Sequence, residues 1–227
     1  NFYFHTTSDE ETNLVLNQFK HEKIIQLPNY IKPTLKIESS GESNYILFIG
    51  RIDPKKAIEN LIEAINISKI FKTKKMKLII AGNHNNKYGD KLNELCKVLN
   101  LSNSVDFIGH VEKQTKDSLY ANAYMTIMPS HNENFGNVVV ESLAQGTPVI
   151  ASTGTPWQIL EKYNAGYWIS NAPETIAKTL DKILSLTKQE YDLIRLNSFK
   201  LMTNEFDIKT KVKRWNDFYK LIITNNK

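Results

Sequence analysis

Short apolar segments alternate with helical segments between residues 45 and 169, and this alternation constrains the fold more than any other feature of the sequence. The apolar segments, which are strand candidates, are residues 45–49, 78–81, 105–108, 125–128, 148–151 and 167–169. Strands that alternate with helices at this spacing are joined by right-handed crossovers, so the strands run parallel and helices cover both faces of the sheet. The sequence therefore predicts an α/β fold with a doubly wound parallel sheet.

Helical periodicity is clearest in residues 57–71, where Ile58, Leu61 and Ile65 lie on one apolar stripe. The remaining helix candidates, the last three of which follow the final strand, are residues 90–99, 114–121, 138–145, 155–162, 172–186, 188–202 and 208–223. The last candidate carries a bulky face around Trp215, and we expect this face to pack against another part of the protein.

The chain before residue 45 has a different pattern. A strand candidate at residues 2–5 leads to Ser8 and Glu11, whose spacing fits a capping box at a helix start. A second strand candidate follows at residues 23–27. Residues 30–44 are rich in proline, serine and glycine and show no apolar periodicity. We therefore expect a domain boundary within residues 30–44.

Composition and motifs exclude several classes of protein. The net charge is +5, but lysines and acids are interspersed, which favours a solvated surface over a nucleic-acid site. Cys96 is the only cysteine, so the sequence predicts a buried thiol and excludes an internal disulfide. No apolar run is long enough to span a membrane. P-loop, G-x-S-x-G and D-x-D motifs are absent, and the histidines lack metal-ligand spacing, so we expect neither a metal nor a cofactor.

Polar residues follow the predicted strands at their carboxyl ends, which is where an open α/β sheet binds its ligand. After the first of these strands, Gly50 allows a sharp turn, and Arg51 and Lys56 bracket the start of a helix. Two cations beside the free N–H groups of a helix suit a diphosphate. The alternative is that both side chains are solvated loop charges.

A second group of residues surrounds another predicted helix start. Gly136 permits close approach of the backbone, Asn137 is the predicted N-cap, and the N–H groups from Val138 onward would face an anion. Glu133 lies before this helix, and Glu141 lies about one turn into it. Taken alone, Glu141 could simply interact with the helix dipole, and Glu133 could be an exposed loop acid. Together with the two cations, these residues favour a ligand site.

Several motifs, taken in order, resemble one known family. They are Gly50-Arg51-Ile52 with Lys56, residues 105–109, Pro129-Ser130, Glu133-Asn134-Phe135-Gly136, and Glu141 with Gly146-Thr147-Pro148-Val149-Ile150. Together they are similar to the retaining glycosyltransferases of family 4 (glycosyl transferases group 1), which have the GT-B fold of two Rossmann-like domains facing a cleft. The spacing of Glu133 and Glu141 matches the E-x7-E signature of that family. Asn134 and Ala57 depart from the family pattern, because many members have glycine at these positions.

The resemblance implies a nucleotide-sugar site with divided roles. Glu133, Arg51 and Lys56 would be the catalytic residues, with Glu133 on hydroxyl groups of the donor sugar and the two cations on the diphosphate. Glu141 would accept hydrogen bonds from the ribose hydroxyls. The remaining donor-binding residues, most of which would act through backbone groups, are Gly50, Gly109, His110, Val111, Phe135, Gly136, Asn137 and Val138.

The resemblance also implies how the chain is divided. Residues 1–36 would be the tail of an N-terminal acceptor domain with the interdomain linker. Residues 37–203 would be the Rossmann-like donor-binding domain, and residues 204–227 a helix that crosses back to the acceptor domain. Because the rest of the acceptor domain is missing, we expect the fragment alone to be inactive.

The implied function is transfer of a sugar from a UDP- or GDP-sugar to a saccharide or lipid-linked acceptor in polysaccharide or glycolipid synthesis. The acceptor would bind through the missing N-terminal domain. We expect a cytoplasmic enzyme with peripheral contact at the inner face of the membrane, and no nucleic-acid partner. Two alternatives share the fold: a non-hydrolysing nucleotide-sugar epimerase, and a non-catalytic nucleotide-binding or interaction module.

Overall fold

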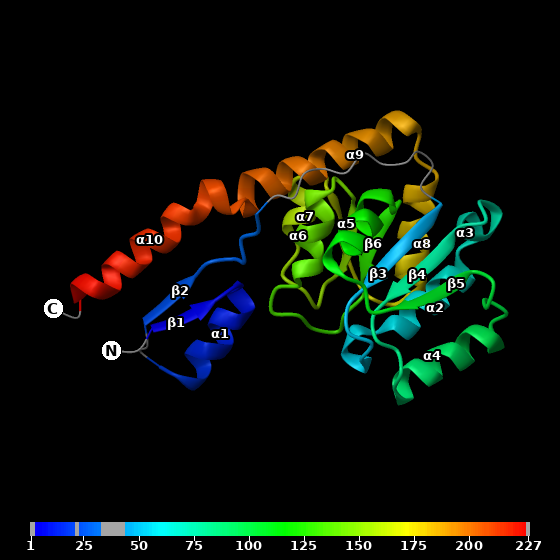
Figure 1. Ribbon diagram of the computed structural model, residues 1–227, viewed down its shortest axis with the longest axis horizontal. Helices are drawn as coiled ribbons and strands as arrows, with labels where there is room; N and C mark the ends of the chain where they lie inside the picture. Colours follow the sequence, from blue (N-terminus) through cyan, green and yellow to red (C-terminus); the bar gives the residue numbers. More distant parts are fainter. Residues whose placement is uncertain (1–2, 21–22, 33–43, 226–227) are drawn as a thin grey trace.

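The computed structural model describes residues 3–20, 23–32 and 44–225 (Figure 1). Its elements in chain order are β1 (Tyr3–Thr6), α1 (Asp9–Gln18), β2 (Lys23–Gln26), β3 (Tyr45–Ile49), the 3-10 helix η1 (Pro54–Lys56), α2 (Ile58–Ile67), α3 (Lys69–Thr73), β4 (Lys77–Ala81), α4 (Lys87–Val98), β5 (Val105–Gly109), α5 (Lys113–Asn122), β6 (Met125–Met128), α6 (Asn137–Ala144), β7 (Val149–Ser152), α7 (Ile159–Lys162), β8 (Gly166–Ile169), α8 (Pro173–Leu184), α9 (Lys188–Leu201), the π-helical turn η2 (Met202–Phe206) and α10 (Ile208–Asn225). The strand candidates between residues 45 and 169 are all confirmed, with ends shifted by at most a residue.

Strands β3 to β8 form one parallel sheet in the order β5-β4-β3-β6-β7-β8. From β3 the chain moves outward to β4 and β5, and from β6 it moves outward in the other direction to β7 and β8. The strand order therefore reverses between β3 and β6, and such a reversal leaves a crevice at the carboxyl ends of the two strands. The predicted doubly wound parallel sheet is confirmed.

Helices cover both faces of this sheet. Ile46 and Phe48 of β3 pack into a core with α2, α4 and α8, whereas the alternate residues Leu47 and Ile49 pack on the opposite face against Tyr120 of α5. Because successive side chains of a strand point to opposite faces, this division shows that the two groups of helices lie on opposite sides. The strand that precedes the crevice is therefore held by packing from both faces.

The predicted helix over residues 57–71 is two helices. Its apolar stripe is confirmed, since Ile58, Leu61 and Ile65 are fully buried. At Ser68 the backbone turns to an extended conformation, and the Ser68 side chain accepts a hydrogen bond from Phe71 N (3.1 Å), which starts α3. Ser68 also donates to Asp181 of α8. A serine N-cap with a tertiary partner therefore interrupts the apolar periodicity.

Strands β1 and β2 pair in parallel as a second, two-stranded sheet, and with α1 they form an N-terminal unit. Helix α10 lies along this unit (Figure 1). The ring centroids of Tyr3 and Phe218 are 5.9 Å apart, and those of His5 and Trp215 are 4.7 Å apart. The bulky face of the last helix therefore packs on β1.

The predicted capping box at the start of α1 is half right. Ser8 is the N-cap and accepts a hydrogen bond from Glu11 N (3.2 Å). The Glu11 carboxylate, however, accepts from the amide and the hydroxyl of Thr7 (2.7 Å each) instead of from the Ser8 amide. The reason is local: Thr7 offers two donors that reach the same carboxylate oxygen.

The expected domain boundary within residues 30–44 falls mostly on residues 33–43, which lie outside the described residues. The division at residue 36 therefore stays a prediction. Among the helices that the structure describes, none has the length and apolar character needed to cross a membrane.

Candidate functional site

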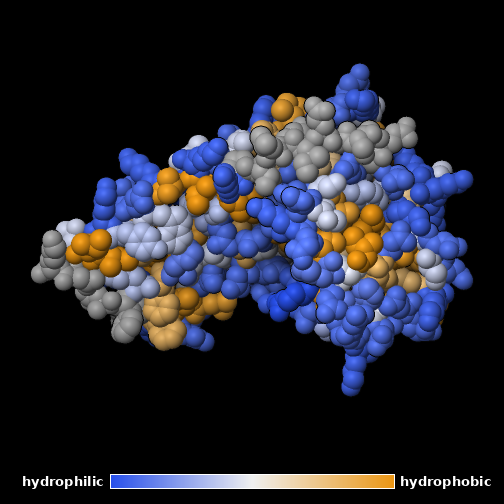
Figure 2. All heavy atoms as spheres, viewed as in Figure 1, coloured by the Kyte–Doolittle hydropathy of each residue, from blue (hydrophilic) through white to orange (hydrophobic). Residues whose placement is uncertain are grey.

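A cavity of about 1520 Å³ lies at the carboxyl ends of the strands of the large sheet. Thr7, Glu11 and Asn29 of the N-terminal unit contribute one of its walls. Mainly hydrophilic side chains face the indentation between the two units (Figure 2). The predicted site residues that line the cavity are Gly50, Arg51, Lys56, His110, Val111, Glu133, Phe135, Gly136, Asn137, Val138 and Glu141.

Gly109 is the predicted site residue that does not line this cavity. Its carbonyl accepts a hydrogen bond from Gly82 N (2.8 Å), so it links β5 to β4. Its φ of +73° is in the region that favours glycine. Gly109 therefore shapes the loop that carries His110 and Val111 into the wall.

The start of α6 differs from the prediction. Gly136, with φ of +82°, is the N-cap, and Asn137 is the first helical residue. The positive φ favours glycine, and a Cβ atom at Gly136 would lie 2.8 Å from the sulfur of Met128, so a larger residue would have to displace the end of that side chain. The Asn137 side chain accepts a hydrogen bond from Asn29 Nδ2 (2.9 Å).

This helix start is open to a ligand. None of the described side chains caps it, and Gly136, Asn137 and Val138 all line the cavity. An uncapped helix N-terminus presents several N–H groups and the positive end of the helix dipole. Such a helix start at the crevice of the sheet suits an anionic group.

The helix start after β3 is different, and here the prediction of free N–H groups is wrong. Asp53 caps η1 by accepting from Lys55 N (2.9 Å), and Ile58 N, at the start of α2, donates to the hydroxyl of Tyr88 (3.0 Å). Burial and the neighbouring Glu59 carboxylate raise the pKa of Tyr88, so its hydroxyl stays protonated. The region after β3 therefore contributes cationic side chains, and α6 contributes the available amides.

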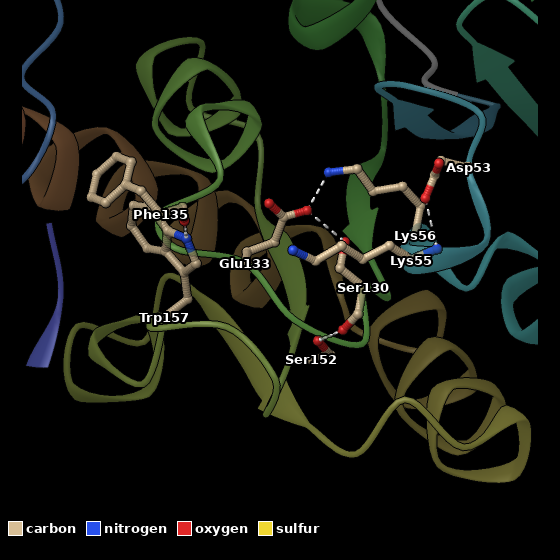
Figure 3. A network of polar contacts seen from close by, with 8 residues as sticks. All are labelled: Asp53, Lys55, Lys56, Ser130, Glu133, Phe135, Ser152 and Trp157. Carbon is tan, nitrogen blue, oxygen red and sulfur yellow. Dashed lines mark hydrogen bonds and ion pairs between the residues drawn. The ribbon is translucent and has the colours of Figure 1, made fainter. Parts of the chain in front are cut away.

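Glu133 is paired, so the alternative that it is an ordinary exposed loop acid is wrong. Lys56 Nζ forms an ion pair with Glu133 Oε1, and Ser130 Oγ donates to the same oxygen (3.0 Å; Figure 3). The side chains of Lys56 and Glu133 are only 14% and 15% exposed. A backbone hydrogen bond from His131 N to Lys55 O (2.9 Å) also connects the loop that carries Glu133 to the segment after β3.

An aromatic cluster supports the loop between Glu133 and α6. Trp157 Nε1 donates to the carbonyl of Phe135, and the two rings lie 5.0 Å apart (Figure 3). Phe206 of η2 completes the cluster, 5.3 Å from Trp157. Sequence reasoning missed the role of Trp157. The available signal was that a buried tryptophan needs an acceptor for its N–H.

Glu141 is held by two side chains of α5. Its Oε1 accepts from Lys116 Nζ (2.6 Å), and its Oε2 accepts from the hydroxyl of Tyr120 (2.9 Å). Burial, with the Glu141 charge, raises the pKa of Tyr120, so this hydroxyl remains a donor. Lys116 and Tyr120 were missed, although their i, i+4 spacing places them on one helix face.

Metal-binding groups are not evident in the described part of the chain. There, no group of three or more His, Cys, Asp or Glu side chains is placed to hold a metal ion. The side chains that line the cavity instead offer ammonium, guanidinium, carboxylate and amide groups. Such a set suits a ligand that carries both an anionic group and hydroxyls.

Comparison with known proteins assigns the family. The model of the family described as glycosyl transferases group 1 matches residues 34–197. The chain belongs to this family. An uncharacterized glycosyltransferase of Methanocaldococcus jannaschii is 37% identical over 146 residues, which cover 63% of this chain and 36% of that protein. The O-antigen chain mannosyltransferase of Salmonella typhimurium is 30% identical over 131 residues, covering 58% and 36%.

Solved structures agree on the fold. Anabaena HepE, solved in complex with UDP and glucose, aligns with a TM-score of 0.84 and 18% identity, covering 95% of this chain and 62% of that one. This chain therefore has the Rossmann-like α/β fold found in GT-B glycosyltransferases. Its alignments span about a third of the two curated relatives, 36% in each case.

Proposed function

We propose that this chain is the donor-binding, C-terminal half of a retaining glycosyltransferase of family 4. The enzyme transfers a sugar from a UDP- or GDP-sugar to a saccharide or lipid-linked acceptor, in polysaccharide or glycolipid synthesis, without a metal ion. One observation carries the proposal: the uncapped start of α6, the Lys56–Glu133 pair and Glu141 all line the same cavity. A helix start, an ion pair and a carboxylate in one cavity can accommodate a ligand that has a phosphate, a sugar and a ribose.

The diphosphate is placed at the start of α6. When the bond between the sugar and the diphosphate breaks, negative charge develops on the leaving phosphate oxygens. The amides of Asn137 and Val138, together with the side chains of Arg51 and Lys56, stabilise that charge. The amides are fixed by the helix and Lys56 is held by Glu133, so these donors need little rearrangement during the reaction.

The two carboxylates bind different parts of the donor. Glu133, beside the phosphate position, accepts hydrogen bonds from hydroxyl groups of the sugar, and Glu141 accepts them from the ribose. The backbone near His110 and Val111 holds the base. The structural similarity to a protein solved with UDP and glucose supports a nucleotide sugar as the donor class.

The N-terminal unit is proposed to be the end of an acceptor domain. Support comes from the packing of α10 on β1 and from the cavity wall that Thr7 and Glu11 provide. The O-antigen chain mannosyltransferase among the relatives supports a saccharide or lipid-linked acceptor. We propose a cytoplasmic enzyme that acts at the inner face of the membrane.

A nucleotide screen tests this function directly. Thermal unfolding of the chain is measured with UDP, GDP and ADP, and with their sugar conjugates, because a ligand that binds only the folded chain raises the unfolding midpoint by mass action. We expect UDP or GDP and the matching sugar nucleotide to raise the midpoint. Glu141→Ala removes this shift; its midpoint without ligand falls, because the Tyr120 hydroxyl and the Lys116 ammonium lose their acceptor, but the variant still unfolds cooperatively. A folded sample that responds to none of the nucleotides contradicts the proposal.

A further inference from the structure

Lys116 places a cation at the part of the cavity where Glu141 lies. Its Nζ is 2.6 Å from Glu141 Oε1, and both side chains line the cavity with similar exposure, 28% and 26%. At this distance the contact is a charge-assisted hydrogen bond. The carboxylate and the ammonium therefore lie side by side on one wall.

The pair retains hydrogen-bonding capacity for a ligand. A carboxylate has about four acceptor positions, of which Lys116 and the Tyr120 hydroxyl occupy two. An ammonium has three N–H donors, and Glu141 accepts one of them. Tyr120 is fully buried and holds the carboxylate from the side of the core. The remaining acceptor and donor positions are close together at the cavity.

We propose that Lys116 is a ligand-binding residue of the nucleoside subsite, where it and Glu141 together recognise the vicinal diol of a ribose. A hydroxyl that donates to Glu141 can accept from Lys116, because each hydroxyl is both a donor and an acceptor. Two adjacent hydroxyls on one ring match a carboxylate and an ammonium held 2.6 Å apart. This inference rests on the proposed function, since it specifies which side chains hold the ribose of the donor.

The charge of Lys116 has a second effect on the same ligand. Glu112, Asp117 and Glu141 all line this wall, and Lys113 is the other cation there. Without Lys116, Lys113 would be the one cation of residues 112–117 to offset these carboxylates, while Arg51 and Lys56 would remain at the proposed diphosphate position. Loss of the charge alone would weaken binding of every diphosphate, with or without a complete ribose. A loss of affinity confined to ligands with a complete ribose would therefore indicate recognition of the diol, whereas an equal loss for all diphosphates would indicate general electrostatic attraction.

The test compares ribose and dideoxyribose ligands. Binding of UDP and 2′,3′-dideoxy-UDP, and of GDP and 2′,3′-dideoxy-GDP, which lack both hydroxyls of the diol, is measured by calorimetry on the parent chain and on Lys116→Met. We expect Lys116→Met to weaken binding of the ribose form about tenfold and of the dideoxyribose form much less, because one charge-assisted hydrogen bond is lost with the ribose only. Lys116→Arg, which keeps the charge and the donors, restores part of the preference for ribose.

The matched control is Lys113→Met, which removes the same charge from the same helix and is expected to weaken both ligands alike. If Lys116→Met also weakens both alike, or changes neither, while the parent chain binds the ribonucleotide, the inference is wrong and the proposed function stands. If the folded parent chain binds no nucleoside diphosphate, the proposed function is wrong, and the inference falls with it. The thermal midpoints of all variants without ligand show whether each is folded.

Discussion

The Lys56–Glu133 pair is the residue-scale feature that most affects both stability and chemistry. Each partner is about one-seventh exposed, so each is shielded from water and depends on the other for charge compensation. The two residues come from opposite sides of the strand-order reversal and lie 77 positions apart in the chain. Their pairing therefore joins the loop after β3 to the loop before α6.

Removal of one partner of this pair should cost more than removal of both. Lys56→Met or Glu133→Gln alone leaves a poorly solvated group without its partner and should lower the free energy of unfolding by about 1–3 kcal/mol. The double variant should lose less than the sum of the single losses. Urea unfolding of the four proteins measures this coupling. Strictly additive losses would show that the ion pair contributes nothing to stability.

Two groups, the buried Cys96 and the partly buried Tyr45, should make stability depend on alkaline pH. Burial raises the pKa of Cys96 from 9.0 to about 11 and that of Tyr45 from 10.0 to about 12. Both groups are neutral when protonated, so above about pH 9 the unfolded chain loses protons that the folded chain keeps. The stabilising effect is complete below the unfolded pKa and disappears as the pH rises through the folded pKa.

Urea unfolding of the parent chain and of Cys96→Ala, at about pH 8 and about pH 10.5, measures this pH dependence. The parent should lose stability between the two conditions, and Cys96→Ala should lose on the order of 2 kcal/mol less, since a pKa difference of about two units corresponds to that energy. Equal losses in the two proteins would mean that Cys96 does not titrate differently on unfolding.

At the scale of elements, the start of α6 depends on one glycine. Gly136 and Gly109 both have positive φ, but a Cβ atom at Gly136 meets Met128 at 2.8 Å, whereas none of the described atoms lies within 4 Å of a Cβ atom at Gly109. This contrast provides a matched pair of substitutions. Alanine at Gly136 adds backbone strain and requires the end of the Met128 side chain to move, whereas alanine at Gly109 adds backbone strain alone.

Gly109→Ala should lower stability by about 1–2 kcal/mol, the cost of a left-handed conformation with a side chain. Gly136→Ala should cost more and should also displace the first amides of α6, which weakens nucleotide binding. Thermal unfolding with and without UDP or GDP measures both effects. If the two variants lose equal stability and Gly136→Ala retains its ligand response, the geometry of Gly136 does not define the anion position.

The two helix starts at the crevice also show why element-level prediction was partly wrong. From the sequence, the start of α2 and the start of α6 both had the pattern of an anion site. Only tertiary contacts distinguish them, because Tyr88 from α4 occupies the Ile58 amide while α6 is left uncapped. The local sequence pattern predicts where a helix starts. It does not show whether a side chain from elsewhere in the chain already accepts from the first amides of that helix.

For the whole molecule, the parallel sheet could be predicted because its strands are short apolar runs, of which the central ones are buried on both faces, and such runs are visible without any knowledge of their neighbours. The cavity could be predicted in outline, because the residues after parallel strands meet at one edge. The pairs Lys56–Glu133 and Lys116–Glu141 could not, because each depends on how two loops or helices are brought together. The packing of α10 on β1 is a long-range contact of the same kind.

Helix α10 should stabilise the N-terminal unit more than the large sheet. Phe218→Ala removes the ring that contacts Tyr3 and leaves a cavity beside β1. Amide hydrogen exchange should then become faster in residues 3–32, while exchange in β3 and β6 stays close to that of the parent chain. Tyr219→Ala is the matched control, since that neighbouring ring is 55% exposed. Faster exchange throughout the chain would show that the two units unfold together.

The wall that the N-terminal unit gives to the cavity has a practical consequence for domain exchange among relatives. The match to the family covers residues 34–197, whereas Thr7, Glu11 and Asn29 precede it in the chain. A hybrid protein joined at residue 34 would combine most of the cavity from one parent with a wall from the other. Exchange of specificity between relatives should therefore transplant the first 32 residues together with the matched segment.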